Sequence, residues 1–216
     1  LTDAAVFSAP AVFVLLWSSG FIGAKFGLPY AGPMTFLTVR MAAVVLLLGL
    51  IAVVTQPPWP SPMGALHSAV TGLLVHGCYL GGVFEAINLK LSAGLVALVV
   101  SLQPVLTATL ANRLLGERVA ARQWAGLALG LAGVYLVVQG RTAGGAPPAA
   151  WAAATLALIG ITIGTLYQKR FGGGIDWRTG FFFQYAAAGS LFALGAYGLE
   201  TRQVQWTGEF LFALAW

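Results

Sequence analysis

Apolar runs of about 20 residues alternate along this chain with short polar, glycine-rich or proline-rich turns. A helix needs about 20 residues to cross a bilayer, and each complete run is long enough. The runs are continuous rather than alternating, and they are too long for the strands of a membrane barrel. The pattern therefore predicts an all-α, multi-pass membrane bundle. The complete runs cover residues 4–27, 34–54, 64–89, 93–115, 119–138, 149–168 and 180–199, and an eighth opens near Gly208.

Composition supports a membrane location. Hydrophobic residues make up 59% of the chain and charged residues 8%, whereas a soluble domain carries about a quarter charged residues. The net charge of +5 is spread over short loops without a basic cluster, which argues against nucleic-acid binding. The one cysteine, Cys78, lies in an apolar run, so no internal disulfide, metal site or cofactor is expected.

The placement of Lys and Arg predicts the orientation in the membrane. The loops after the fourth and sixth runs hold most basic residues, and such loops are cytoplasmic. The N-terminus is then cytoplasmic, and the protein is expected in the cell (inner) membrane. Asp3 stands where a signal peptide would be basic, so no cleavable signal is predicted. The basic residues of these two loops are Arg113, Arg118, Arg122, Lys169, Arg170 and Arg178.

A weak internal repeat divides the chain. Residues 17–27 (WSSGFIGAKFG) are similar to residues 161–172 (ITIGTLYQKRFG), so we expect a first five-helix repeat at 4–139 and a linker at 140–148. Residues 149–216 would be an incomplete second repeat, with its first two helices and the start of a third. Five is an odd number of crossings, so the copies would be inverted, as in many secondary transporters whose site lies near the midplane.

Four short motifs mark a known family. They are QPVLT at 103–107, GER at 116–118, QWAG at 123–126 and GLAGV at 130–134. In this order they resemble the end of the first domain in the drug/metabolite transporter superfamily, in proteins built from two EamA-type domains. The resemblance implies ten membrane helices and transport of small organic solutes such as amino acids or related metabolites, often outward. It says little about the particular solute.

Polar and aromatic side chains near the middle of the runs are candidates for lining a solute cavity. An aromatic and amide lining with few charges suits an aromatic or amphipathic solute. Helix packing is the competing interpretation for each aromatic residue and for His76. Pro104 also predicts a kink, because proline removes a helical hydrogen bond. The candidates are Trp17, Ser18, Ser19, His76, Tyr79, Gln103, Pro104, Tyr167 and Gln184.

Charged residues within the spans are gating or coupling candidates, because charges inside a membrane are costly. Lys25, Arg40 and Glu85 are predicted in the outer half. We expect Glu85 to pair there with Arg40 or Lys25, which would close a gate or relay protons. The alternative is that Glu85 forms only an interfacial ion pair with snorkelling basic side chains. Glu117 and Arg118 lie in a cytoplasmic turn that is either simply solvated or a gating contact.

Two sets of glycines predict faces for close helix packing. Gly77 and Gly81 lie on the third run. Gly126, Gly130 and Gly133 lie on the fifth.

These features favour a secondary transporter that binds a small organic solute in the bilayer, with protons as a candidate coupling ion. A nucleotide-driven pump is not expected, because the sequence has no GxxxxGK[ST] motif. An enzyme is not expected either, because G-x-S-x-G and H-E-x-x-H motifs are absent. An intramembrane enzyme and a structural or channel-type subunit remain the alternatives. The sequence does not distinguish a monomer from a homodimer.

Overall fold

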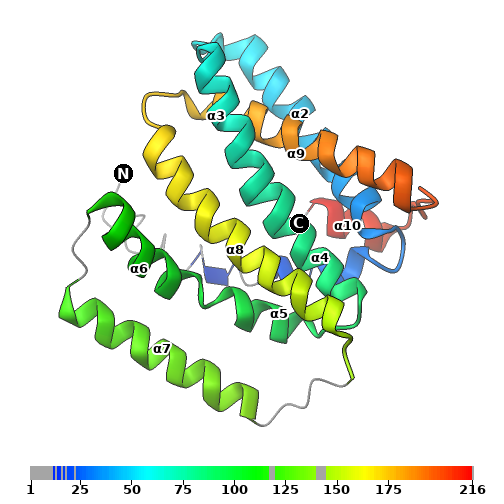
Figure 1. Ribbon diagram of the computed structural model, residues 1–216. Coiled ribbons are helices and arrows are strands. Elements are labelled where there is room, and N and C mark those ends of the chain that lie inside the picture. Colours follow the sequence, from blue (N-terminus) through cyan, green and yellow to red (C-terminus); the bar gives the residue numbers. More distant parts are fainter. Residues whose placement is uncertain are drawn as a thin grey trace.

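The computed structural model describes residues 12, 14–15, 17, 19–21, 23–116, 120–139 and 145–215, and these residues form a bundle of helices (Figure 1). The described residues between 12 and 27 are helical and are called the N-terminal helix below. The other helices are α2 (Pro33–Thr55), α3 (Pro62–Gly72), η1 (Leu73–Leu80), α4 (Gly81–Asn88), α5 (Ala93–Val100), α6 (Gln103–Leu115), α7 (Ala121–Gln139), α8 (Pro148–Phe171), α9 (Trp177–Leu199) and α10 (Gly208–Ala215).

The predicted all-α membrane architecture is confirmed. Within the described residues, four helical segments are long and apolar enough to cross a membrane: Pro33–Thr55, Pro62–Asn88, Ala93–Ala111 and Pro148–Phe171. Helix α9, also predicted as a span, has 23 residues. It is less apolar, because glutamine, tyrosine and several glycines interrupt its leucines and phenylalanines.

The helices pack around two central elements, the segment α3–η1–α4 and helix α8 (Figure 1). The segment α3–η1–α4 forms one continuous rod that packs against α8 and α9, and α2 lies along α9 (Figure 1). On the other side of α8 lie α5 and α6. At one end of the bundle, Phe36 stacks on Phe84 at 5.2 Å and meets the edge of Phe210 at 5.5 Å between ring centroids. This buried contact joins α2, α4 and α10.

The fourth span is broken next to Pro104, as the sequence predicts. Helix α5 ends at Val100, and α6 begins at Gln103 with the proline in its first turn. Proline fits there because the first amides of a helix have no partner within it. The Ser101 hydroxyl donates to the Leu98 carbonyl at 2.7 Å, so the break is partly satisfied by side chains.

The third span contains a π-helical segment, which the sequence did not reveal. Segment η1 covers eight residues, Leu73–Leu80, and π-helical turns are wider and rarer than α-helical ones. The span thus turns its side chains by a different angle in the middle than at its ends. His76 and Tyr79 both lie on this segment.

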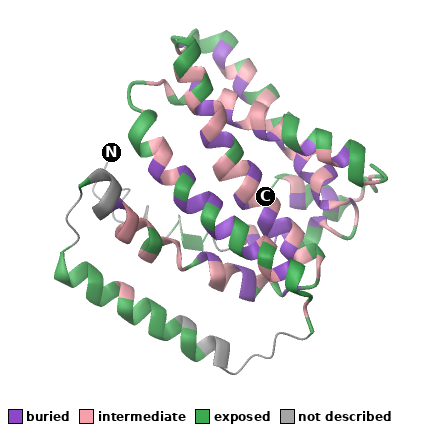
Figure 2. Cartoon of the chain, in the orientation of Figure 1, coloured by how far each residue is buried: buried purple, intermediate pink, exposed green. Residues whose placement is uncertain are grey.

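The predicted glycine faces differ in outcome. A Cβ added to Gly77 or Gly81 would lie 3.0 Å from Leu191 or Phe192 of α9, so this face does pack closely. Within the described part of the chain, Gly126, Gly130 and Gly133 have no atom within 4 Å of that position, so no described helix packs on this face. Figure 2 shows why: the described side chains of α7 are exposed apart from half-buried Leu127.

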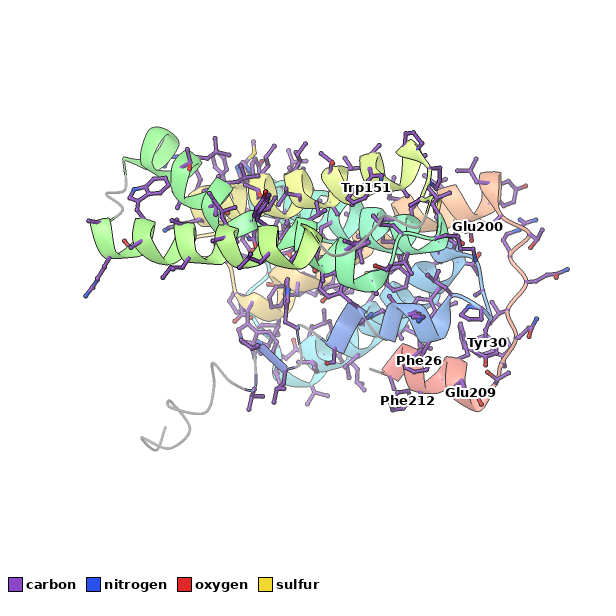
Figure 3. All side chains as sticks on the ribbon, turned by 90° about the horizontal axis from the view of Figure 1, so that it is seen from below. Phe26, Tyr30, Trp151, Glu200, Glu209 and Phe212 are labelled. Atoms are coloured by element: carbon purple, nitrogen blue, oxygen red, sulfur yellow. The ribbon has the colours of Figure 1, made fainter. Side chains whose placement is uncertain are left out.

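Both ends of α9 are fixed by carboxylates. Asp176 accepts a hydrogen bond from the Arg178 amide at 2.9 Å, and the Arg178 guanidinium lowers the pKa of Asp176 to about 2, so this cap is ionised at neutral pH. Past the other end, Glu200 accepts hydrogen bonds from the Met34 and Thr35 amides at 2.8 Å and from the Thr35 hydroxyl at 2.6 Å. Glu200 therefore caps α2 from a distant part of the chain. Figure 3 shows Glu200 at the end of the bundle that also holds Tyr30 and Glu209.

Candidate solute cavity

A cavity of about 230 Å³ lies between the N-terminal helix, α2, the third span and α9. Its lining combines rings with one guanidinium. The principal side chains are Trp17, Phe21, Arg40, His76, Tyr79 and Tyr185. Three of these residues, Trp17, His76 and Tyr79, are cavity residues predicted from the sequence, and Arg40 is a predicted gating residue.

Stacked rings shape this cavity. Trp17 and Tyr79 are almost parallel, with centroids 5.9 Å apart and planes at 6°. His76 and Tyr185 stack at 4.2 Å and 28°. His76 and Tyr79 share the cavity from the π-helical segment. Stacked flat groups of this kind provide a surface for an aromatic or amphipathic solute.

Arg40 is the only charged residue among the described residues that line this cavity. It is the eighth residue of α2, about 10 Å along the axis from the first residue of the helix. Among the described residues, no carboxylate lies within 4 Å of its guanidinium. An arginine stays protonated in proteins, so the cavity carries a positive charge inside a membrane span.

His76 adds an unsatisfied polar atom. Its Nε2 is buried and has no hydrogen-bond partner among the described residues. Buried polar atoms in folded proteins are usually paired, and each exception asks for an explanation. A solute or a water molecule in the cavity would supply the partner.

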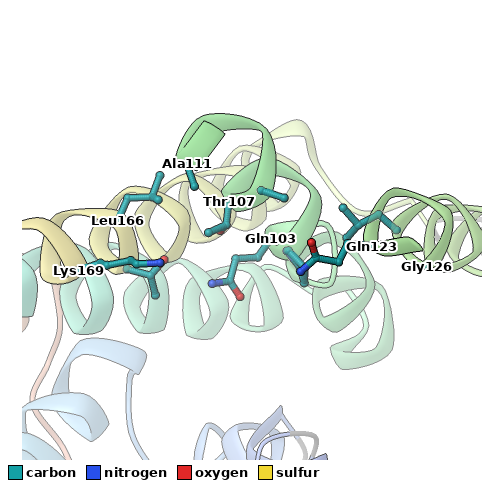
Figure 4. A pocket seen from close by; sticks show the side chains of 11 residues that line it. Gln103, Thr107, Ala111, Gln123, Gly126, Leu166 and Lys169 are labelled. Atoms are coloured by element: carbon teal, nitrogen blue, oxygen red, sulfur yellow. The ribbon is translucent and has the colours of Figure 1, made fainter. Parts of the chain in front are cut away.

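A second cavity, of about 640 Å³, lies between α6, α7 and α8 (Figure 4). Gln103 and Pro104 line it, as predicted cavity residues, together with Thr107 and Lys169. The buried Thr107 hydroxyl has no partner among the described residues. This cavity is flanked by the exposed helix α7, and it lacks the aromatic lining of the first.

The remaining predicted cavity residues lie elsewhere. The Tyr167 hydroxyl is 2.7 Å from His67 Nδ1, whose ring stacks on Phe171 at 4.6 Å. Buried Gln184 lines a third cavity of about 110 Å³ that also includes His67. The Ser19 hydroxyl donates to the Leu15 carbonyl at 2.6 Å. Ser18 lies outside the described residues. Described members of the predicted set thus line different cavities.

The charged gating residues are also separated. Arg40 lines the 230 Å³ cavity, whereas Glu85 lines an apolar cavity of about 430 Å³ between α2, α4, α8 and α9. No ion pair within 4 Å joins the two in the described part of the chain. Lys25 is exposed. The functional coupling of Arg40 and Glu85 stays a prediction. Glu117 and Arg118 lie outside the described residues.

Sequence reasoning missed Tyr185 and Phe21. Tyr185 directly follows the predicted Gln184, but neighbours on a helix point in directions about 100° apart. Which of them faces the cavity depends on how α9 is rotated against the third span. The sequence alone contains no signal for that rotation.

Secondary transporters bind their solutes in cavities among membrane helices. Residues 6–139, more than half of the chain, match the EamA-like transporter family. The chain belongs to this family, as the motif resemblance predicted.

Curated relatives agree. The chain is 27% identical over 167 residues to an uncharacterized inner membrane transporter, YedA, of Escherichia coli. The aligned region covers 76% of this chain and 53% of the relative. It is 27% identical over 215 residues to an uncharacterized transporter, YvbV, of Bacillus subtilis (94% and 67%). A chloroplastic WAT1-related protein of Arabidopsis thaliana is 32% identical over 122 residues (56% and 29%). The chain spans about half the length of the first of these relatives. These matches support a transporter located in a membrane.

Proposed function

We propose that this protein is a secondary transporter that moves small organic solutes, amino acids or related metabolites, out of the cell by alternating access. The observation that carries the proposal is the Arg40 cavity. Two stacked ring pairs and one guanidinium face a space among the membrane helices. Such a space binds a solute through flat contact and a few polar contacts.

Alternating access requires two halves that rock against each other around the site. The sequence repeat between residues 17–27 and 161–172 supports an inverted pair of repeats. The cavity lies between helices from both predicted copies: α2 and the third span from the first, and α9 from the second. A solute in this position would contact both moving parts. Protons are the candidate coupling ion, with Glu85 as the candidate carrier.

The test is flux in proteoliposomes that contain the full-length protein. A carrier gives saturable uptake that is stimulated by solute on the opposite side, whereas ohmic single-channel currents would identify a channel and refute the proposal. A growth-protection screen with toxic amino-acid and metabolite analogues supplies the substrate and the direction. Resistance of overexpressing cells indicates export, and heightened sensitivity indicates uptake.

A variant pair connects flux to the cavity. Tyr185→Ala removes a stacked ring and should lower the flux of the identified solute by about fivefold, given about 1 kcal/mol per aromatic contact. Tyr197→Ala is the matched control, because Tyr197 is on the same helix but is exposed. Equal flux in both variants would place the solute elsewhere.

A further inference from the structure

The charge balance of the Arg40 cavity is one-sided. Among the described residues of the lining, Arg40 is the single charged side chain, and none is an aspartate or glutamate. The rings of Tyr185 and His76 line the same cavity as Arg40. A guanidinium held inside a membrane without an anion is costly. An anionic group in the cavity would remove that cost.

The acid on the neighbouring span does not supply this anion. Glu85 lines the apolar 430 Å³ cavity and a second one at the end of the bundle, which it shares with Asn88 and Glu200. Neither cavity includes Arg40. The two opposite charges are therefore kept apart, and the positive one faces the ring-lined space.

We infer, resting on the proposed transport function, that the solute bound beside Arg40 is an aromatic organic acid, with a carboxylate and without an ammonium group. Its carboxylate pairs with the guanidinium, whose planar fork of donors matches two carboxylate oxygens. Its ring lies along Tyr79 and Tyr185. His76 Nε2, which has no hydrogen-bond partner among the described residues, is available for one further polar contact.

The same lining disfavours amines and zwitterions. An ammonium group in this space would lie near a guanidinium, and no described residue of the lining has a carboxylate to offset the repulsion. The volume of about 230 Å³ is below the range of about 300–1,000 Å³ that is usual for ligand cavities. A single ring with a short acidic chain suits it better than a fused or polycyclic compound.

Three probes of one shape separate these chemistries: 3-phenylpropionate, 3-phenylpropanol and L-phenylalanine. Their binding to the purified full-length protein in detergent is measured by titration calorimetry. We expect the acid to bind at least about tenfold more tightly than the alcohol or the amino acid, which is the ratio expected for one charge-assisted hydrogen-bonded pair.

Variants assign the preference to Arg40. Arg40→Gln should weaken binding of 3-phenylpropionate by about tenfold or more and abolish the preference over the alcohol, and Arg40→Lys should retain part of it. Arg170→Gln is the matched control, because Arg170 is exposed at the end of α8, outside the cavity. If Arg40→Gln does not fold, as judged by size-exclusion elution, the inference is tested by the binding of the three probes to wild type and to Arg40→Lys. A preference for the acid in wild type that is reduced in Arg40→Lys supports it, and equal binding of the three probes to wild type overturns it.

The outcomes distinguish this inference from the proposed function. Tight binding of the acid without flux in proteoliposomes retains the inference and refutes transport. Saturable flux of L-phenylalanine or 3-phenylpropanol that is unchanged by Arg40→Gln retains transport and overturns the inference. Absence of measurable 3-phenylpropionate binding to folded wild-type protein also overturns it.

Discussion

Single residues determine how closely the helices of this bundle approach. Gly82 is buried on α4 where that helix crosses α8, and an added Cβ would lie 2.5 Å from the Ala153 carbonyl oxygen. That neighbour is backbone, which cannot rotate away as a side chain can. The contact between α4 and α8 therefore depends on the missing side chain at this position.

Gly82→Ala should destabilise the protein, because one methyl group forces the two helices apart. Overpacking of this kind costs about 1–3 kcal/mol, and the thermal unfolding temperature of the detergent-purified protein should fall. Gly198→Ala serves as the control, since Gly198 is exposed on α9 with nothing within 4 Å. There the better helix propensity of alanine should leave stability unchanged or slightly raised. Similar unfolding temperatures for the two variants would contradict the close approach.

At the scale of helical elements, the ends are held by contacts between distant segments. The first turn of α2 has no capping side chain of its own, and Gly32 occupies the N-cap position. Glu200, just past the end of α9, takes the free amides of this turn instead. A carboxylate is favourable there, because the N-terminus of a helix carries a partial positive charge. The backbone bridge between Ala31 and Val204 reinforces the same junction.

Glu200→Ala should therefore loosen this junction. Loss of a helix cap made by a charged acceptor costs about 1–2 kcal/mol, measurable as a lower unfolding temperature and as faster hydrogen exchange at the start of α2. Glu209→Ala is the comparison, because Glu209 is an exposed acid in the first turn of α10. If both variants lost the same stability, the cap would have no special role.

At the scale of the whole molecule, the junction at Glu200 joins the two parts of the predicted repeat. Residues 30–35 belong to the first predicted copy and residues 200–205 to the second. With a cytoplasmic N-terminus, this junction lies on the outer side. The opposite turns, at residues 56–61 and 172–176, would then be cytoplasmic.

Cysteine labelling tests this orientation. In a Cys78→Ala background, Thr201→Cys should react with a membrane-impermeant maleimide added to intact cells, and Gly173→Cys should react only after the cells are opened. Both positions are exposed, so accessibility depends on the side of the membrane. The reverse pattern would show that the N-terminus is outside and that the charge-based assignment is wrong.

Much of the fold follows from the sequence, because span length and apolarity have direct physical causes. Helix α2 occupies Pro33–Thr55 where the pattern predicts residues 34–54, and α8 occupies Pro148–Phe171 where it predicts 149–168. Proline fixes where the fourth span breaks. The GER and QPVLT motifs indicate the family that residues 6–139 match.

The candidate site is predicted less well from the sequence, because the side chains that face the cavity depend on how each helix is rotated about its axis. Depth along a span can be counted from the sequence, and three residues chosen by depth, Trp17, His76 and Tyr79, line one cavity. Gln103 was chosen by the same depth criterion as these three residues, but it lines a different cavity, between α6, α7 and α8. Nor does depth show that Arg40 and Glu85, both charged, line separate cavities.

The sequence by itself determined the class of this protein: an all-helical membrane chain of the EamA-like family. Its long apolar runs are unfavourable in water, so they predict membrane spans. Its family motifs are short stretches of neighbouring residues, so they can be recognised without the tertiary structure. The tertiary structure alone decided which side chains share a space. The π-helical turn at Leu73–Leu80 and the packing of α9 against it set the directions of His76, Tyr79 and Tyr185. Those directions arise from contacts between distant segments, and so a linear pattern does not contain them.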